Sequence, residues 1–529
     1  MTYNKYHGIS DIMQLRYTEH ENFLAFDKPY DFRTHQVADG QFGFVEHVAE
    51  KLSKSLFVVH RLDKGTSGLI LFATTKEAAA NISQLFEKHL IKKTYYFLTH
   101  ASLAEHQFTI NSHIEKQNGT YFNIEDKEAN SETEFQFIQA VGTNFLWAAK
   151  PKTGKPHQIR LHAEKAGIPI LGDAEHGGRP FHRLALHAKE LKFTLDGKTF
   201  EVTSELPPIF QKEFNTTLEA LLYENWHKRQ ILYHIPENES YRLLHLESTD
   251  IRADVFSERL WVYDYTHDGI TSEEQDAIQS FSKEKNLQPI IRHMLNRGQG
   301  VGGLEQSTLH NSSANTNWVA QEESVCYHLR TDSGFSPGLF LDQRENRIWV
   351  KQNSSNKSVL NLFCYTSGFS VNAALGKAKQ VTSVDVSAKF LNWSRENFQL
   401  NEIDPQKHEF FAQDSLVFLK GSVKRGRKWD LIICDPPSFG RSKESVWKLE
   451  RDLPELASSL IQCLNKNGKI LFTCNLEKKT RQDIIQLFQK GLKNKKQWNF
   501  DRLPLLSLDY ELTDDRVNLM KGFFVLQSQ

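Results

Sequence analysis

The chain has 529 residues and a formal net charge of zero at pH 7, and 39% of its residues are hydrophobic and 25% charged. At roughly 150 residues per domain, this length predicts two to four globular domains, each able to bury a core. The neutral balance excludes a uniformly polybasic chain, although a local basic groove would be enough to bind RNA.

Membrane and cysteine signals are weak. No apolar run approaches the roughly 20 residues of a membrane span, and the polar beginning of the chain is not typical of a secretory signal. We therefore expect a cytoplasmic protein without a membrane partner. All five cysteines lie in the second half and none forms a C-x-x-C pair. This pattern predicts neither a disulfide framework nor a zinc site, and we expect no bound metal.

Residues 1–215 are predicted to form a strand-rich α+β domain with a mixed, mainly antiparallel sheet. Apolar runs indicate strands at residues 69–73 and 95–98. Thr74 and Glu77 have the spacing of a capping box, and the apolar residues that follow fall on one helical face. A helix is expected to begin there.

Residues 216–345 are predicted to contain a connecting helix and linker, followed by a small α/β domain. In residues 346–529 apolar strands alternate with helices, which is typical of a doubly wound, Rossmann-like parallel sheet. The strands of this sheet are expected at residues 359–363, 381–385, 429–434 and 469–474.

One glycine-rich stretch is interpreted as a decoy. Residues 298–303 read Gly-Gln-Gly-Val-Gly-Gly and match G-x-G-x-x-G, but a polar, irregular segment follows them. A phosphate-binding loop needs a helix at that point, so the stretch is predicted to be a flexible loop.

Asp63 is the first candidate catalytic residue. It stands between basic neighbours in residues 60–68, on a tight loop before an apolar strand, where a carboxylate is held rigidly and kept ionised. An isolated Arg-x-Asp is more often a surface turn. Here two other segments accompany it: Tyr95 follows a basic pair on a predicted strand, and residues 154–162 are predicted to place Arg160 and two histidines on another.

Together these segments resemble the RluA-type pseudouridine synthases over roughly residues 15–210. The resemblance implies an enzyme that flips a uridine out of RNA and isomerises it without cofactor or metal. Asp63 would act as nucleophile or base, and Arg160 would hold its carboxylate in a charge-assisted pair. Tyr95 would stack on the base and help to move a proton.

Plainer roles exist for some of these side chains. Tyr95 could be a core aromatic, and we interpret His157 and His162 as structural histidines. Many members of this family carry an S4-type RNA-binding domain before the catalytic domain, and the short segment before residue 15 does not suffice for one. We therefore expect RNA affinity to come from elsewhere in the chain.

The second candidate site begins at residues 359–368, where a buried strand runs into a loop of small residues and then a helix. Backbone N–H groups in such a loop can approach a ligand at the carboxyl end of the sheet, which makes Phe363, Thr366 and Gly368 candidate cofactor contacts. Asp385 ends the next strand, where an acid can hydrogen-bond ribose hydroxyls.

Two further aspartates continue the pattern. Asp414 is expected where adenine contacts belong, and Asp435 opens the run Asp-Pro-Pro-Ser-Phe at the end of an apolar strand. The prolines stiffen the exit of the strand, so that a polar edge and an aromatic ring could grip a flat base. Taken singly, an aspartate after a strand is more often a helix cap.

In this order the features resemble the class I S-adenosyl-L-methionine-dependent methyltransferases. Residues 338–344, Gly-Leu-Phe-Leu-Asp-Gln-Arg, narrow the resemblance to the RlmI and RlmKL group, and the small preceding domain resembles that group as well. The resemblance implies S-adenosylmethionine as cofactor and large-subunit ribosomal RNA as substrate. Ser367 stands where the family usually has glycine, which puts cofactor affinity in question.

The methylated atom stays open between two branches of the group. Cys474 stands where cytosine-C5 members carry their nucleophilic thiolate, although it could equally be a small buried residue. Residues 361–365 look more like the guanine-N7 branch, which needs no cysteine. Cys434, inside an apolar strand, is interpreted as core packing.

The leading hypothesis is a bifunctional RNA-modifying enzyme, a uridine isomerase fused to a base methyltransferase. Alternatively, one half has become an RNA-binding platform, or the whole chain is a non-enzymatic ribosome assembly factor. We infer RNA as the partner and no protein partner.

Overall fold

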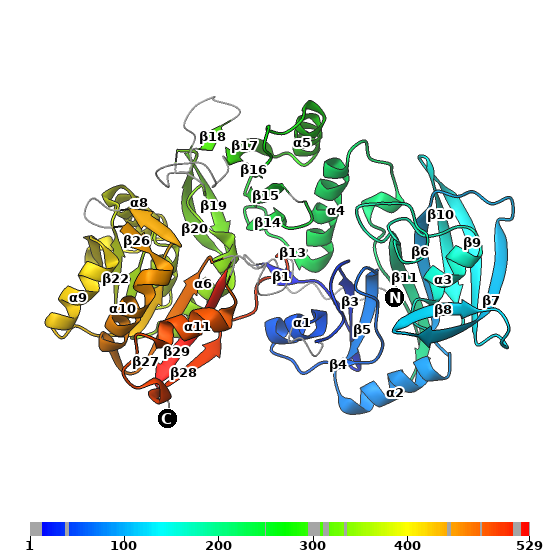
Figure 1. The fold of residues 1–529 in the computed structure, drawn as a ribbon, viewed down its shortest axis with the longest axis horizontal. Helices are drawn as coiled ribbons and strands as arrows, with labels where there is room; N and C mark the ends of the chain where they lie inside the picture. Colours follow the sequence, from blue (N-terminus) through cyan, green and yellow to red (C-terminus); the bar gives the residue numbers. More distant parts are fainter. Residues whose placement is uncertain are drawn as a thin grey trace. The chain divides into compact units, whose positions relative to one another are not determined.

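The computed structural model describes residues 13–36, 42–248, 250–294, 307–309, 317–332, 336–441, 446–476, 479–510 and 520–527. The glycine-rich stretch predicted to be a loop lies outside the described residues. The chain divides into two compact units (Figure 1). Unit 1 comprises the described parts of residues 1–236, 246–249 and 270–286, and unit 2 comprises the rest. The three-domain boundaries drawn from the sequence stay a prediction.

A mixed sheet of eleven strands forms the body of unit 1, in the order β2-β3-β5-β11-β6-β10-β9-β7-β8, with β12 beside β11 and β4 beside β5. β11 runs parallel to β5, and its other neighbours, β6 and β12, are antiparallel to it. The mixed, mainly antiparallel α+β fold is confirmed. The strands are β2 (Thr18–Glu19), β3 (Phe23–Lys28), β4 (Phe57–Val58), β5 (Ser67–Ala73), β6 (Lys92–Thr99), β7 (Gln107–Gln117), β8 (Thr120–Ile124), β9 (Ser131–Val141), β10 (Asn144–Pro151), β11 (Leu186–Leu195) and β12 (Lys198–Thr203).

Helices of unit 1 pack against this sheet and against one another. α2 packs against β5, α3 against β7 and β9, and α4 against α5 and β3. The helix predicted near residue 74 is α2, but its cap is Thr75, whose Oγ1 accepts the N–H of Ala78 at 3.1 Å. The helices and the remaining strand pair are α1 (Phe44–Leu52), α2 (Lys76–Glu87), α3 (Gln158–Lys165), η1 (Pro208–Phe210), α4 (Thr217–Leu232), α5 (Ser272–Glu284), β1 (Gln14–Leu15) and β13 (Tyr233–His234).

The strand predicted within residues 154–162 is wrong, because the chain forms α3 there. His157 adopts a left-handed conformation (φ 57°) and turns the chain immediately before the helix. The Gln158 side chain fixes this turn: its Oε1 accepts the N–H of Lys155 at 3.0 Å and its Nε2 donates to the carbonyl oxygen of Glu132 at 2.9 Å. All of residues 158–163 are buried, so their apolar positions carry no helical period.

A buried lysine holds the loops at the end of β3. Lys28 Nζ donates to the carbonyl oxygens of Pro29 at 2.8 Å and Phe32 at 2.7 Å, and to that of Lys64 at 3.3 Å. The last carbonyl belongs to the loop between β4 and β5 that carries Asp63. Burial lowers the pKa of Lys28 to about 7, against the opposing effect of nearby Asp31 and Asp63.

Unit 2 contains a seven-stranded sheet in the order β23-β22-β21-β24-β27-β29-β28. The five strands from β23 to β27 are parallel, and β29 is antiparallel to both of its neighbours. Chain order reverses between β21 and β24, which is where ligands bind to doubly wound sheets. The four predicted strands are confirmed. The strands are β21 (Ser358–Leu362), β22 (Gln380–Asp385), β23 (Glu409–Ala412), β24 (Trp429–Cys434), β27 (Leu464–Cys474), β28 (Trp498–Arg502) and β29 (Lys521–Gln527).

Helices pack on this sheet (Figure 1). α7, α8 and α9 contact strands among β21, β22 and β23, whereas α10 contacts β27 and α11 contacts β29. No helix among the described residues is long and apolar enough to cross a membrane. The helices of unit 2 are η2 (Leu341–Gln343), α6 (Arg344–Asn353), α7 (Gly368–Leu375), α8 (Ala388–Leu400), η3 (Pro405–Lys407), α9 (Ser415–Lys424), α10 (Leu449–Gln462), α11 (Arg481–Gln489) and η4 (Lys495–Gln497).

Smaller strand groups of unit 2 precede and flank the parallel sheet. A five-stranded sheet runs in the order β14-β15-β16-β17-β18, and β19 and β20 form a hairpin. Trp261 and Trp318 from these strands share one apolar core with Phe398 of α8. The remaining strands are β14 (Ser240–Leu244), β15 (Ile251–Phe256), β16 (Arg259–Asp264), β17 (Gln288–Met294), β18 (Ser307–Leu309), β19 (Asn317–Glu322), β20 (Val325–Arg330), β25 (Phe439–Arg441) and β26 (Val446–Lys448).

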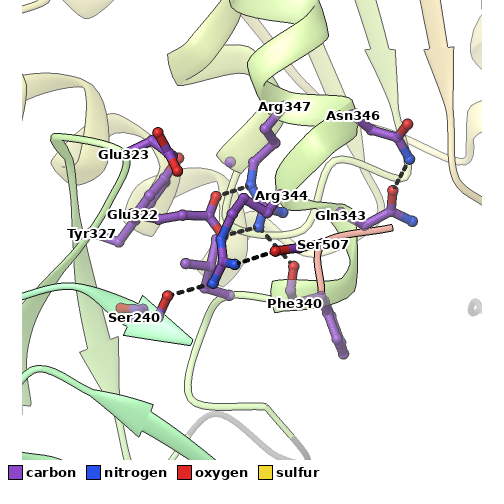
Figure 2. Close-up of polar contacts among 12 residues, drawn as sticks. Ser240, Glu322, Glu323, Tyr327, Phe340, Gln343, Arg344, Asn346, Arg347 and Ser507 are labelled. Carbon is purple, nitrogen blue, oxygen red and sulfur yellow. Dashed lines mark hydrogen bonds and ion pairs between the residues drawn. The ribbon is translucent and has the colours of Figure 1, made fainter. Parts of the chain in front are cut away.

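Two buried arginines of α6 tie these parts of unit 2 together (Figure 2). Arg347 pairs with both carboxylate oxygens of Glu322 at 2.6 and 2.5 Å. Arg344 donates to the carbonyl oxygen of Ser240 at 2.6 Å, to Ser507 Oγ at 3.1 Å and to Asp509 at 3.1 Å. Strands β14 and β19 and the segment before β29 are thus bonded to one helix.

We predict that Arg344→Met destabilises unit 2 by about 3–5 kcal/mol, because it removes a buried guanidinium that pairs with the buried carboxylates of Asp509 and Glu322. Lys389→Met, which removes an exposed ion pair with Asp332, is the matched control and should change stability by less than about 1 kcal/mol. Urea unfolding of the full chain checks both. Equal effects of the two changes would contradict a stabilising role for the buried pair.

For Lys28 we predict a pH-dependent contribution to stability. The unfolded side chain titrates near pH ~10.4, whereas the folded one titrates at about 7, so between these values only the unfolded state holds the proton. Raising the pH from 7 to 9 should therefore stabilise the wild-type chain relative to Lys28→Met, by up to about 1.4 kcal/mol per pH unit. Thermal unfolding at both pH values measures this, with exposed Lys76→Met as control. Parallel curves for the two variants would show that Lys28 does not titrate in this range.

Candidate active sites

The loop that carries Asp63 is fixed by hydrogen bonds on both sides. Thr34 Oγ1 accepts the N–H of Leu62 at 3.1 Å and donates to its carbonyl oxygen at 3.0 Å. His60 Nε2 accepts the N–H of Leu71 in β5 at 3.0 Å, and burial keeps this imidazole neutral by lowering its pKa to about 3. The Asp63 carboxylate is therefore presented by a rigid turn, as expected.

Glycine is required where this turn enters the sheet. Gly68 has a φ of 106° and lies against β11, so closely that a Cβ atom would stand 2.4 Å from the carbonyl oxygen of Ala188. Neither the conformation nor the space admits another residue. The start of β5 can therefore approach β11 only with glycine at this position.

Tyr95 lies on β6, opposite Ala149 of β10 and Ala188 of β11, and its hydroxyl lies in the electrostatic field of Asp63. Burial, and then the Asp63 charge, raise the pKa of Tyr95, so its phenol stays protonated. A protonated phenol can donate a proton or a hydrogen bond. The Asp63 charge acts on this phenol, and a shared site for the two residues stays a prediction.

Arg160 does not pair with Asp63 in this structure, contrary to the prediction. Its Nε and Nη2 donate to the two Asp173 oxygens at 2.6 Å each, and Nη2 also donates to Glu175 at 2.7 Å. Although burial opposes it, the Asp173 pair raises the pKa of Arg160. Buried Asp173 offers both oxygens to the guanidinium fork, and this bidentate geometry outcompetes a single contact elsewhere.

Lys28 and His157 lie in the electrostatic field of Asp63, and the sequence interpretation gave neither a catalytic role. His157 Nδ1 is 3.1 Å from His176 Nε2 and 3.7 Å from Glu175, and ligand atoms of these three residues lie close enough to surround a metal ion. The Arg160 guanidinium already supplies positive charge to Glu175. For Lys28, the sequence feature that could have indicated a role is the run Asp-Lys-Pro at the end of β3.

His162 is a structural histidine, as interpreted. Its Nε2 lies 2.8 Å from Ser112 Oγ and 3.1 Å from Ser131 Oγ, and its Nδ1 lies 2.9 Å from Thr133 Oγ1. Burial lowers its pKa to about 4, so the ring is neutral. Both ring nitrogens have hydroxyl partners where α3 packs against the sheet. It has no free edge for catalysis.

In unit 2 the loop after β21 is strained and clamped. Phe363, Tyr365 and Ser367 all have left-handed backbones, with φ of 55°, 49° and 65°. Such conformations cost of order 1–3 kcal/mol each and persist only where the surroundings hold them. Asp385 Oδ2 accepts the Tyr365 N–H at 2.9 Å, and its Oδ1 accepts the Ser387 N–H at 2.9 Å. One carboxylate thus joins the ends of β21 and β22.

The backbone at Ser367 explains why the methyltransferases that this segment resembles usually have glycine here. The residue before α7 must adopt a left-handed conformation, which favours glycine. The serine hydroxyl lies 2.7 Å from Ser394 Oγ, and Ser394 Oγ donates to the carbonyl oxygen of Tyr365 at 3.2 Å. These bonds tie the loop to α8 and offset part of the strain. The loop keeps its shape with serine in place.

The other predicted cofactor contacts also border this loop. The N–H of Phe363 donates to Ser415 Oγ at 3.3 Å, and Thr366 Oγ1 donates to the carbonyl oxygen of Gly338 at 2.5 Å. Gly368 begins α7. Asp414 caps α9: its Oδ1 accepts two backbone N–H groups at 3.0 Å, so this residue has the helix-capping role named above as the alternative.

Burial raises the pKa of Asp385 despite its hydrogen bonds from backbone N–H groups.

Asp435 follows β24 at the switch point of the sheet and is held by two donors. Thr473 Oγ1 donates to its Oδ1 at 2.6 Å, and Gln343 Nε2 donates to its Oδ2 at 3.3 Å. Burial raises the pKa of Asp435 to about 6, and nearby Asp342 acts in the same direction, against the Thr473 hydrogen bond. The aromatic ring of Phe439, which follows the two prolines, is exposed.

Cys474 is not placed to act as a nucleophile. Its side chain is 0% exposed within an apolar core, and burial raises the pKa of its thiol to about 12. A thiol needs access and a lowered pKa to attack a base. The structure therefore does not support the predicted catalytic role of Cys474. Cys434 is also 0% exposed in the same core, which confirms the interpretation of that residue.

Comparisons with known proteins match the two units separately. The model of the RNA pseudouridylate synthase family matches residues 22–165, in unit 1, and that of the S-adenosylmethionine-dependent methyltransferase family matches residues 307–499, in unit 2. A methyltransferase solved in complex with SAH shares the fold over 64% of this chain and 88% of its own, with 23% identity and a TM-score of 0.52.

Curated relatives extend the second match. Ribosomal RNA large subunit methyltransferase K/L of Shewanella frigidimarina is 38% identical over 36% of this chain and 26% of its own length. This chain covers only 22–36% of the length of such K/L relatives. Ribosomal RNA large subunit methyltransferase K of Neisseria meningitidis is 30% identical over 44% of this chain and 68% of its own length. The chain thus carries an RNA pseudouridylate synthase domain in unit 1 and belongs, through unit 2, to the S-adenosylmethionine-dependent methyltransferase family of ribosomal RNA large subunit methyltransferase K.

Proposed function

We propose that the chain is a bifunctional enzyme that converts uridine to pseudouridine in unit 1 and methylates a base in unit 2, both in large-subunit ribosomal RNA. One observation carries the proposal: each unit has its own candidate site, Asp63 on a hydrogen-bonded turn in one and Asp435 at the switch point of the sheet in the other. A protein with this substrate would act in the cytoplasm, and RNA is the only partner we propose.

In unit 1 the Asp63 carboxylate acts on a uridine that has left its stack, as nucleophile or as base. The reaction breaks a C–N bond to the ribose and forms a C–C bond within the same nucleotide, so no external group or electron is needed. Tyr95 packs against the flipped base and its protonated phenol can return a proton.

In unit 2 the residues around β21 and β22 fit S-adenosylmethionine. Asp385 uses one lone pair on each oxygen for backbone N–H groups and keeps others for ribose hydroxyls. Exposed Val386 offers an apolar face beside it. Phe363, Thr366 and Gly368 line the loop that would approach the cofactor, and we propose that Asp414 lies near its adenine. The cofactor would supply an electrophilic methyl group.

The buried thiol of Cys474 favours a target that needs no enzyme nucleophile. A ring nitrogen with its own lone pair, such as guanine N7, can accept a methyl group directly, whereas C5 of cytosine needs a thiolate adduct first. Asp435 would then orient the base by accepting a hydrogen bond from its edge. We therefore propose the guanine-N7 branch.

We predict that Asp63→Ala and Asp435→Ala each abolish one modification and leave the other. Full-length variants, expressed in cells that lack the wild-type chain, are followed by mass-spectrometric mapping of ribosomal RNA. Asp63→Ala should remove pseudouridine from its target and retain the methyl group, and Asp435→Ala should do the opposite. Exposed Asp126→Ala is the matched control and should change neither. If either active-site change leaves both modifications in place, that unit is a binding platform and not an enzyme.

Cys474→Ala separates the two methylation routes. We predict that this variant keeps methyl transfer within about twofold of wild type and loses about 1 kcal/mol of stability, because a small buried side chain is truncated. Methyl incorporation into RNA and thermal unfolding measure the two effects. A folded Cys474→Ala chain without methyl transfer would reinstate the thiolate route.

A further inference from the structure

Gln343 is a buried side chain to which neither the sequence interpretation nor the reaction described so far gives a role. It ends η2, directly before α6, and is 3% exposed. Its Nε2 donates to Asp435 Oδ2 and to Thr473 Oγ1, at 3.3 Å each. Thr473 in turn donates to Asp435 Oδ1 at 2.6 Å. Gln343 and Thr473 therefore supply the donors at both carboxylate oxygens.

The orientation of the Gln343 amide is determined by its second neighbour. Asn346 Nδ2 donates to Gln343 Oε1 at 2.7 Å (Figure 2), which directs the NH₂ group of Gln343 toward Asp435. An ionised carboxylate can only accept hydrogen bonds, so the opposite amide orientation would place two acceptors face to face. The three side chains thus form a directed relay that ends at the Asp435 carboxylate.

The segment that carries Gln343 cannot easily move. Figure 2 shows Arg347 bonded to Glu322, and the same guanidinium donates to the carbonyl oxygen of Phe340 at 2.8 Å, three residues before Gln343. Arg344, the next residue, is buried and bonded to Ser240 and Asp509. A supporting residue locked in this way can hold a reactive group in place.

We propose that Gln343 is a positioning residue for methyl transfer: its amide keeps the Asp435 carboxylate ionised and aimed at the target base. This inference rests on the proposed function of Asp435. Burial raises the pKa of Asp435 to about 6, against the hydrogen bond from Thr473. The Gln343 amide places a second donor on the other carboxylate oxygen, and a hydrogen bond of this kind favours the ionised form. Gln343 supplies that support from outside the sheet, on a segment that precedes β21.

The test compares Gln343→Met, which keeps the shape but has no N–H, with exposed Gln380→Met as the matched control in the same unit. Loss of a donor to the ionised form should raise the midpoint of the acidic limb of the kcat profile by about one pH unit. The variant should therefore lose about fivefold in kcat near pH 6 and recover most of it at pH 8.5, with affinity for S-adenosylmethionine within twofold of wild type. Gln343→Glu, which opposes two carboxylates, should shift the midpoint further.

A reduction in kcat of the same size from pH 6 to pH 9 would indicate a merely structural role and overturn the inference, as would an unchanged profile. Thermal unfolding gives a readout that does not need activity. Because the folded carboxylate of Gln343→Met would hold its proton to higher pH, the stability deficit of this variant should grow as pH rises from 5 to 8. If the wild-type chain transfers no methyl group, the proposed function fails, and a deficit that does not change with pH would separately overturn the role of Gln343.

Discussion

A charge buried in a protein has to find its partners inside the protein, and both candidate sites depend on this constraint. In unit 1, buried Lys28 donates its N–H groups to three carbonyl oxygens, and one of these belongs to Lys64, next to Asp63. In unit 2, buried Arg347 satisfies its N–H groups on Glu322 and on the carbonyl oxygen of Phe340. In each case a buried basic side chain holds the backbone of a segment near a candidate site.

The strained loop after β21 shows the same logic for the backbone. Tyr365 and Ser367 hold left-handed conformations because Asp385 accepts the Tyr365 N–H and Ser394 is bonded to the Ser367 hydroxyl. Polar contacts from β22 and α8 thus stabilise the strained conformation of the loop. A loop held in this way has its shape fixed before a ligand arrives, which reduces the ordering cost of binding.

Sequence patterns predicted several strands of both sheets because apolar runs report burial directly, as in β24. Motifs made Asp63, Tyr95 and Asp435 candidate site residues. Sequence patterns failed for α3, where burial on every side erases the helical period. The partner of Arg160 was missed because Asp173 and Asp63 are both aspartates near basic residues, and only the fold decides which meets the guanidinium. Gln343 was visible only as part of a family motif, since its partners Asp435 and Thr473 lie far from it in the sequence.

Neighbouring residues of β27 show why residue type alone does not assign chemistry. Successive side chains of a strand point to opposite faces of a sheet. Thr473 directs its hydroxyl to Asp435, so Cys474 must face the other side, where it packs in the apolar core. A nucleophilic cysteine at this position would need the strand to shift by one residue, which would remove the Thr473 donor from Asp435. The register that builds the Asp435 site is therefore the register that buries the thiol, and it favours methyl transfer without a covalent enzyme adduct.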